Sequence, residues 1–174
     1  MILRPLKREE IEAIWTIDRR EEHHYIYTLQ DGKLTRTTAY FEVPGWAPGQ
    51  AEKDTPLLYA CFDRGGAFLG MVDEDQLVGV AVIDTIPLGT ARDHLQLQYL
   101  YISRDYRGQG IGTRLFEESK EIARSRGARF LYISATPTEN TVDFYLRRGC
   151  RLAAPPDPKL FALEPEDIHL VCAL

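Results

Sequence analysis

Residues 99–123, YLYISRDYRGQGIGTRLFEESKEIA, join an apolar strand to a helix through a loop that is rich in arginine and glycine. Residues 95–103 have the composition of a strong strand, and the apolar residues of 115–123 recur at helical spacing. Gly127 stands where a helix C-terminal cap belongs. Loops of this kind often hold phosphate, because backbone N–H groups and the helix dipole both point at the anion.

The spacing of the glycines indicates which phosphate ligand fits. A P-loop needs Lys and Ser/Thr after its last glycine, but Thr and Arg follow Gly112, so that pattern fails. The dinucleotide fingerprint is G-x-G-x-x-G, whereas Gly108, Gly110 and Gly112 give G-x-G-x-G, a weak match. What remains is Arg107-x-x-Gly110-x-Gly112 between a strand and a helix. A turn that merely reverses the chain is the alternative.

With this loop the chain resembles the GNAT superfamily of N-acetyltransferases, whose signature is Arg/Gln-x-x-Gly-x-Gly/Ala in the same setting. The resemblance continues through ISATPTENTVDFYLRRGC, residues 133–150, which is similar to the family's next strand and helix, and it spans residues 76–152. It implies acetyl-coenzyme A (acetyl-CoA) as co-substrate, an amine as acceptor, and direct attack of the amine on the thioester. No metal is expected, because the four scattered histidines show no ligand spacing.

The resemblance also implies roles for individual residues. The pyrophosphate would lie on the glycine loop, and the pantetheine arm would pair with the strand before it. The implied cofactor-binding residues are Leu100, Tyr101, Ile102, Arg107, Gly108, Gln109, Gly110, Ile111, Gly112, Thr113 and Asn140. Asn140 has a helix N-cap as its alternative role, and Thr138 matches the family's more usual register.

Tyr145 occupies the place of the family tyrosine that protonates the leaving thiolate. A phenol of ordinary pKa is protonated at neutral pH and can donate. Ordinary core packing is the alternative for this residue, since Phe144 and Tyr145 lie on a predicted amphipathic helix.

An ammonium must lose a proton before its nitrogen can attack, so the reaction needs a general base. The sequence does not show which residue this base is. Many members carry Glu on the strand that leads to the loop, but the polar positions here are Gln96 and Gln98, which cannot act as bases. Candidate replacements are Asp84, His94, His23, His24 and Glu42. A small-molecule amine is the expected acceptor; the alternatives are a protein N-terminus or lysine, or a non-catalytic acyl-CoA-binding regulatory module.

The predicted elements make one α/β domain of residues 1–174. They are strands at 2–4, 67–72, 76–85, 95–103, 129–135 and 168–173, helices at 7–18, 113–126 and 141–148, and a hairpin that turns at Asp31-Gly32. This order predicts a mixed sheet flanked by helices. The resemblance makes it a mostly antiparallel, GNAT-like acyl-CoA N-acyltransferase fold. Residues 19–56 are expected to be an acceptor-side elaboration, in which Trp46 either covers the acceptor or pins its own loop.

Composition limits the partners. The net charge of −5 argues against a nucleic-acid partner, and no apolar run is long enough to cross a membrane. The charged N-terminus does not read as a signal peptide, and the three cysteines form no CxxC pair. We therefore expect a cytoplasmic protein with reduced thiols. Many members of the family form homodimers, which this sequence does not decide.

Overall fold

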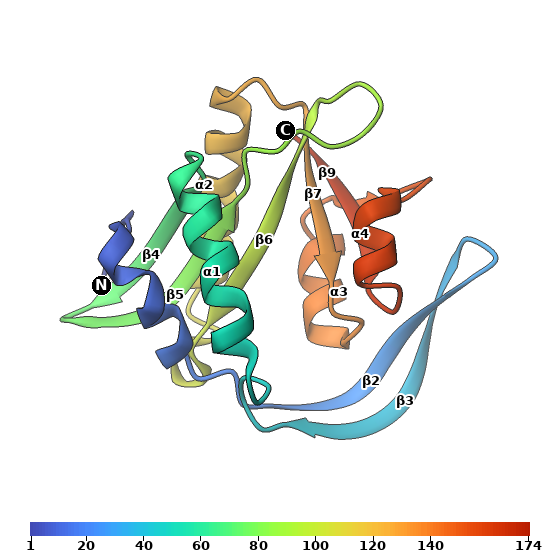
Figure 1. The fold of residues 1–174 in the computed structure, drawn as a ribbon. Coiled ribbons are helices and arrows are strands. Elements are labelled where there is room, and N and C mark those ends of the chain that lie inside the picture. Colours follow the sequence, from blue (N-terminus) through green and yellow to red (C-terminus); the bar gives the residue numbers. More distant parts are fainter.

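The apolar runs along the chain assemble into one seven-stranded sheet in the computed structural model, which describes residues 1–174 (Figure 1). The strand order is β1-β4-β5-β6-β7-β9-β8. The strands are β1 (Ile2–Pro5), β4 (Ala67–Asp73), β5 (Gln76–Ile83), β6 (His94–Ile102), β7 (Phe130–Ala135), β8 (Arg151–Leu152) and β9 (Ile168–Ala173). Only β6 and β7 pair in parallel, so the predicted mixed and mostly antiparallel sheet is confirmed.

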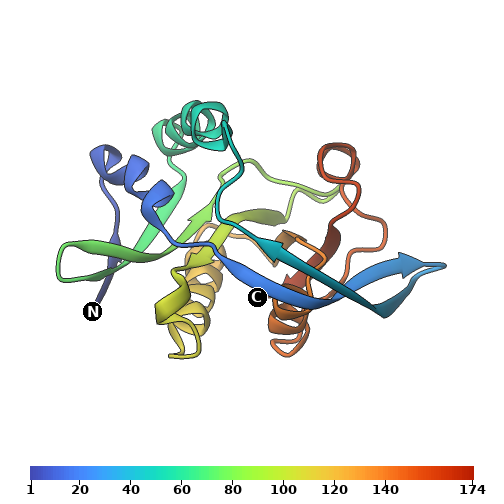
Figure 2. The ribbon, with the colours of Figure 1, turned by 90° about the horizontal axis from the view of Figure 1, so that it is seen from below.

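Helices cover both faces of the sheet (Figure 2). They are η1 (Arg8–Thr16), α1 (Gln50–Asp63), η2 (Arg104–Tyr106), α2 (Ile111–Ser125), α3 (Glu139–Leu146) and α4 (Pro158–Leu163). The elements η1, α1 and α4 lie on one face, and α2 and α3 lie on the other. None of the helices is both long enough and apolar enough to cross a membrane.

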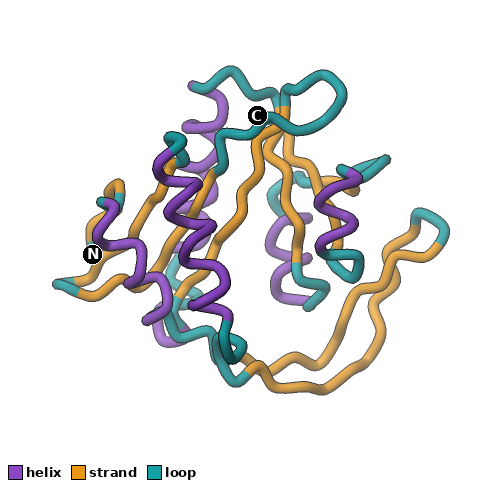
Figure 3. Tube along the Cα trace, viewed as in Figure 1, coloured by secondary structure: helices purple, strands orange, loops and turns teal.

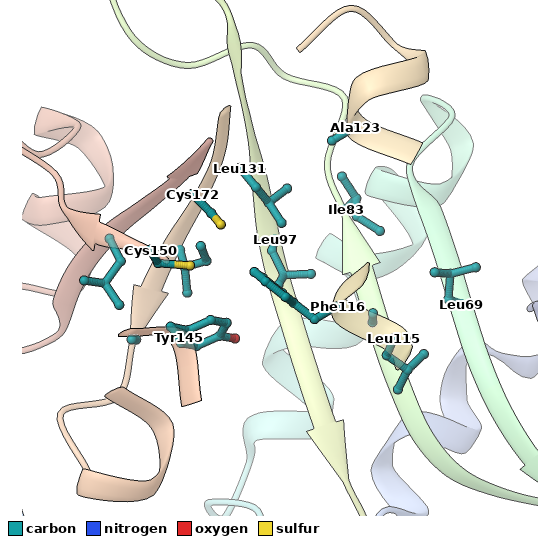
Figure 4. Close-up of a cluster of buried hydrophobic side chains, with 14 of the residues drawn as sticks. Leu69, Ile83, Leu97, Leu115, Phe116, Ala123, Leu131, Tyr145, Cys150 and Cys172 are labelled. Atoms are coloured by element: carbon teal, nitrogen blue, oxygen red, sulfur yellow. The ribbon is translucent and has the colours of Figure 1, made fainter. Parts of the chain in front are cut away.

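Each face of the sheet has its own hydrophobic core. On the α2–α3 face, the fully buried Leu115 and Phe116 of α2 pack over the sheet (Figure 4). Gly79 of β5 allows this close approach, because a Cβ there would lie 3.2 Å from side-chain atoms of both Ile111 and Leu115. On the other face, η1 and α1 bury a second cluster that includes Leu58.

The strands β6 and β7 start side by side and then separate (Figure 1). Their parallel pairing covers only residues 94–96 and 130–132. Beyond that point the two strands diverge toward their carboxyl ends, and the glycine loop follows β6 there. The divergence leaves a V-shaped opening in the middle of the sheet.

A β-bulge at Gln98 changes which face the side chains of β6 occupy. Leu97 pairs with Ile83 and Tyr99 pairs with Val82, so Gln98 is the extra residue. Leu97 packs in the α2–α3 core, whereas Tyr99 and Tyr101 pack in the α1 core. Without the bulge, the strict alternation of a strand would place these three side chains on one face.

The segment after η1 forms a long hairpin of β2 (Glu21–Gln30) and β3 (Lys33–Val43), which extends away from the sheet (Figure 3). Its turn is at Asp31 and Gly32, both with positive φ, as the Asp-Gly pair predicts. The hairpin passes below the carboxyl ends of β6 and β7. Tyr27 holds it there, because its N–H donates to Pro137 O (2.7 Å) and its hydroxyl donates to Asp143 Oδ1 (2.7 Å).

Several local predictions were wrong. The predicted helix at 7–18 is a 3₁₀ helix over Arg8–Thr16, and α3 begins at Glu139 rather than at 141. Helix α1 was not predicted, since Pro56 inside it and its weak apolar periodicity hide it in the sequence. Helix α4 was also missed, although Asp157 caps it and Pro158 begins it.

Candidate active site

A cavity of about 550 Å³ occupies the opening between β6 and β7. The end of β6, the glycine loop, helix α3 and the base of the hairpin contribute its walls. All of the predicted cofactor-binding residues except Gln109 line it. The Gln109 amide turns back and donates to Asp105 O of its own loop (3.1 Å). The structure therefore brings together residues that the resemblance had grouped by motif.

The glycine loop has the backbone shape of an anion site. Gly108 (φ 75°) and Gly110 (φ 81°) adopt left-handed conformations, which other residues enter only with strain. Helix α2 begins at Ile111, and its first turn has no side-chain cap and no acidic residue. Its first N–H groups are therefore free to bind an anion at the positive end of the helix dipole.

The Arg107 side chain bonds to the protein itself. Its guanidinium donates to Ile102 O (3.0 Å), Arg20 O (3.1 Å) and Asp18 O (3.3 Å). It also lies 3.5 Å from a carboxylate oxygen of Glu21. Arg107 thus joins the end of β6 to the segment that leads into β2.

Asn140 lies in the first turn of α3 and is not its N-cap, which is Thr138. The Asn140 amide donates to Glu21 Oε1 (2.8 Å) and lines the cavity. The N-cap alternative for Asn140 was therefore wrong, because the helix starts two residues earlier than that alternative required. Glu21 connects Asn140 and Arg107 across the entrance of the hairpin.

Tyr145 lies on α3 with its side chain almost fully buried against Phe116 and Phe144 (ring centroids 5.6 and 5.1 Å away). Figure 4 shows its hydroxyl directed from α3 toward β6. The residue lines the cavity, and burial raises the pKa of its phenol far above the usual value. The hydroxyl therefore keeps its proton at neutral pH, as a general acid requires.

Asp84 is tied up in hydrogen bonds beneath the bulge. It accepts from Arg64 Nη2 (2.7 Å), the Thr85 N–H (2.6 Å) and Gln98 Nε2 (2.8 Å). Burial by itself would raise the pKa of Asp84, but the hydrogen bonds from Arg64 and Thr85 outweigh it and hold the pKa below its usual value. The Asp84 carboxylate oxygens already accept these hydrogen bonds, and Asp84 does not line the cavity, so it is not placed to act as the base.

Three other candidate bases lie away from the cavity. His94 is at the start of β6, where its Nδ1 is 2.8 Å from Asp93 Oδ1 and its ring stacks on Phe130. His24 is exposed on the hairpin, and Glu42 accepts a hydrogen bond from Tyr40 on the exposed strand β3. These positions follow from the register of the strands and cannot be derived from residue type.

His23 is the candidate base that lines the cavity. Its side chain is 2% exposed, its Nδ1 has no hydrogen-bond partner, and its Nε2 lies 3.6 Å from Glu21 Oε2. Burial lowers its pKa below 6.5, against the opposing effect of the Glu21 carboxylate. His23 is therefore a neutral imidazole at neutral pH, which is the form that can accept a proton.

The sequence reasoning missed Arg19 and Arg148, which both line the cavity. Arg148 lies over the ring of Phe144 (3.5 Å to the centroid) and donates to Thr113 Oγ1 at the start of α2. Arg148 could have been found from the sequence, because it stands two residues after the Phe144-Tyr145-Leu146 run. Nothing in the local sequence of Arg19 marks it as a cavity residue.

Trp46 is anchored by its own surroundings. Its Nε1 donates to Ile17 O (2.9 Å), and its ring packs edge-on against Trp15 (4.8 Å) and Tyr101 (5.0 Å). Of the two expectations for Trp46, the structure therefore shows the one in which it pins its loop to the domain.

Comparisons with known proteins agree with this geometry. The chain matches the model of the Acetyltransferase (GNAT) family over residues 38–150. N-alpha-acetyltransferase 30 of Schizosaccharomyces pombe is 32% identical over 84 residues, which are 46% of this chain and 55% of that protein. The match thus spans about half the length of this curated relative.

Solved structures show the same fold. A nourseothricin acetyltransferase superposes with a TM-score of 0.71 at 19% identity, over 99% of this chain and 97% of that chain. A Bacillus anthracis protein assigned as a streptothricin acetyltransferase, in complex with acetyl coenzyme A, gives 0.73 at 13% identity, over 99% and 98%. The PaiA N-acetyltransferase of Thermoplasma acidophilum, in complex with coenzyme A, gives 0.64 at 17% identity, over 99% and 98%. The chain, with its mixed sheet opened beside a glycine loop, belongs to the GNAT family of acetyltransferases.

Proposed function

We propose that this protein transfers the acetyl group of acetyl-CoA to a primary amine of a small molecule, by direct attack in a ternary complex. The observation that carries the proposal is the glycine loop at the mouth of the opening between β6 and β7. The structures of related fold in complex with acetyl coenzyme A and with coenzyme A support this choice of co-substrate.

The cavity suits the shape and charge of that co-substrate. The uncapped first turn of α2 and the left-handed Gly108 and Gly110 suit the pyrophosphate, and Arg148 adds positive charge nearby. The pantetheine arm would enter the opening and pair with the backbone of Leu100 and Ile102, as a strand adds to a sheet edge. Acetyl-CoA supplies the thioester that the amine attacks.

Two side chains are proposed to move protons. The neutral His23 imidazole takes the proton of the incoming ammonium, because it is the candidate base in the cavity and its Nδ1 is unpartnered. The Tyr145 hydroxyl donates its proton to the sulfur as the C–S bond breaks. The nitrogen then loses a second proton as the amide forms, and this proton restores the Tyr145 hydroxyl. The first proton passes from His23 to solvent, so the reaction releases one proton in total.

We also propose that residues 19–56 are the acceptor side of a single domain. The hairpin passes below the carboxyl ends of β6 and β7, and His23 and Phe41 line the cavity from it. A cavity of about 550 Å³ suits a small acceptor better than it suits a protein chain.

Two observations favour other functions. The match to an N-alpha-acetyltransferase favours a protein N-terminus as acceptor. Position 98 on β6 holds a glutamine, which donates to Asp84, where a catalytic base would need an acidic residue. The missing base favours a regulatory module that binds acyl-CoA without turnover. Acetylation of small amines well above the rate of thioester hydrolysis would dismiss the second, and a preference for free amines over peptides would dismiss the first.

The test is calorimetric titration with acetyl-CoA, with NADH and ATP as controls, followed by a panel of amines with thiol-release detection. We expect selective binding of acetyl-CoA at micromolar concentration and acetylation of at least one amine. Absence of acetyl-CoA binding would refute the proposal.

A further inference from the structure

Arg19 stands out among the arginines near the cavity because its guanidinium contacts only aromatic rings. Its Cζ lies 4.5 Å from the ring centroid of Trp46 and 4.3 Å from that of Tyr101. Arg107, in contrast, donates to three carbonyl oxygens. A guanidinium carries five N–H donors, and ring contacts satisfy none of them. The polar edge of Arg19 is therefore free to bind an acceptor group in the cavity that it lines.

The position of Arg19 is fixed before any ligand binds. Asp18 accepts at its carbonyl from the Arg104 N–H (3.0 Å) and donates its own N–H to Ser103 Oγ (3.0 Å). On the other flank, Arg20 O accepts from Arg107 (3.1 Å). The aromatic side of the site is equally rigid, because Trp46 is bonded to Ile17 O. Such preorganisation lowers the entropy cost of binding.

Arg19 lies on the acceptor side of the sheet. The bulge at Gln98 sends Tyr101 to the α1 face, where it packs with Trp46. The glycine loop lies on the other face, since a Cβ on Gly112 would touch Phe144 and Ile102. The anion that Arg19 meets is therefore not the pyrophosphate on the glycine loop.

The charges around Arg19 identify the kind of acceptor. Glu21 is the acidic residue that lines the cavity together with Arg19. Its carboxylate would attract the ammonium of an acceptor. A guanidinium and a carboxylate in one cavity thus suit a molecule that carries one anionic group and one amine.

Building on the proposed acetyltransferase function, we infer that the acceptor is a free amino acid or a similar amine that bears one carboxylate, which Arg19 binds through its planar fork. In the reaction, the carboxylate would remain on Arg19 while the amine nitrogen forms the bond to the acetyl carbon and the coenzyme A thiolate leaves. Arg19 is a specificity-determining residue and exchanges no proton.

Matched pairs of acceptors test the inference. Each pair is an amino acid and its decarboxylated amine, such as phenylalanine with phenethylamine and lysine with cadaverine. We expect the wild-type kcat/KM to be at least about tenfold higher for the amino acid, which is the usual scale of a charged hydrogen bond. Equal values within each pair would overturn the inference while leaving the acetyltransferase function intact; failure of acetyl-CoA to bind would instead defeat that function.

A variant assigns the preference to Arg19. Arg19→Gln should lower kcat/KM for the amino acid by about ten- to one-hundredfold and change it less than about twofold for the decarboxylated amine. Arg151→Gln, an exposed arginine on β8, is the matched control and should change neither. Equal losses on both members of a pair would show that Arg19 only supports the fold, and would overturn its role.

Product binding gives a second readout that needs neither turnover nor a variant. With the wild-type protein saturated with coenzyme A, an N-acetyl amino acid should bind more tightly than the N-acetyl amine that lacks the carboxylate. Equal affinities would overturn the inference.

Discussion

The guanidinium of Arg107 donates a 3.1 Å hydrogen bond to the carbonyl oxygen of Arg20, and so fastens the glycine loop to the segment that leads into strand β2. The two residues are far apart in sequence, and only the fold brings them together. The same guanidinium also holds Asp18 and Ile102. The motif arginine therefore joins the end of β6 and the glycine loop to the segment that leads into β2.

We predict that Arg107→Ala lowers the stability of the protein and weakens acetyl-CoA binding together. Each bond lost from the charged guanidinium contributes about 1.5–3 kcal/mol at most, and the carbonyls left behind can be hydrated in part, so a loss of about 2 kcal/mol is expected. Thermal unfolding and calorimetry measure the two effects. Arg104→Ala removes a half-exposed arginine of the same loop and is the control; similar losses in both variants would contradict the role of Arg107.

Gly110→Ala should destabilise the loop through its backbone. At φ 81° an L-residue is strained by about 1–2 kcal/mol, although a Cβ there would meet no atom within 4 Å. Gly112→Ala is the comparison, since Gly112 lies inside α2 and its Cβ would only approach Phe144 at 3.3 Å. Denaturant unfolding should show the larger loss for Gly110→Ala, and the reverse order would contradict the strain argument.

Tyr145→Phe should lower kcat by about ten- to a hundredfold or more and leave the affinity for acetyl-CoA nearly unchanged, because only the proposed general acid is removed. Packing against Phe116 and Phe144 is kept, so the unfolding midpoint should change little. Steady-state kinetics and titration separate the two effects. An unaltered kcat would remove Tyr145 from the mechanism.

His23→Gln tests the proposed base through the pH dependence of kcat/KM. Burial lowers the pKa of His23 below 6.5, so the imidazole stays neutral in the wild type down to mildly acid pH, and kcat/KM should then fall as it becomes protonated. In the variant that acid limb should vanish, along with about 10²-fold of activity at neutral pH. His24→Gln, on the exposed neighbour, is the control. An identical pH profile in His23→Gln and wild type would exclude His23 as the base.

Asp167→Asn should stabilise the protein at alkaline pH. Burial, and secondarily the Glu164 charge, raise the pKa of Asp167 from 3.8 to about 6. A raised folded pKa means that the folded state favours the protonated carboxyl, so its contribution to stability is full below pH 3.8 and is lost as the pH rises through about 6.

At pH 8 the variant should therefore be more stable than the wild type. The pKa shift sets an upper limit of about 3 kcal/mol on the gain in free energy of unfolding, and partial exposure of the side chain to solvent reduces that gain. The difference should shrink toward pH 4. Thermal unfolding at both pH values measures it, with the exposed Glu166→Gln as the control for loss of one negative charge. A difference that does not depend on pH would contradict the prediction.

The sequence by itself determined the strands of the sheet other than β8, together with the glycine loop and the helix that follows it. These features depend on local patterns: alternating or continuous apolar residues predict strands, and glycines at left-handed positions predict the loop. The last strand, Ile168–Ala173, and the hairpin turn at Asp31-Gly32 were placed for the same reason. The family motif then supplied the predicted cofactor-binding residues, and all but Gln109 line one cavity.

Only the tertiary structure decided which of the other side chains line the cavity. A single extra residue at Gln98 moves Tyr99 and Tyr101 to the other face of the sheet, and no local pattern announces it. His23 and Arg19 reach the cavity because the hairpin folds under two diverging strands. Asp84 is an equally suitable candidate base in the sequence, but in the fold its carboxylate is hydrogen-bonded to Arg64. Residue type sets what a side chain can do, but long-range packing decides what it meets.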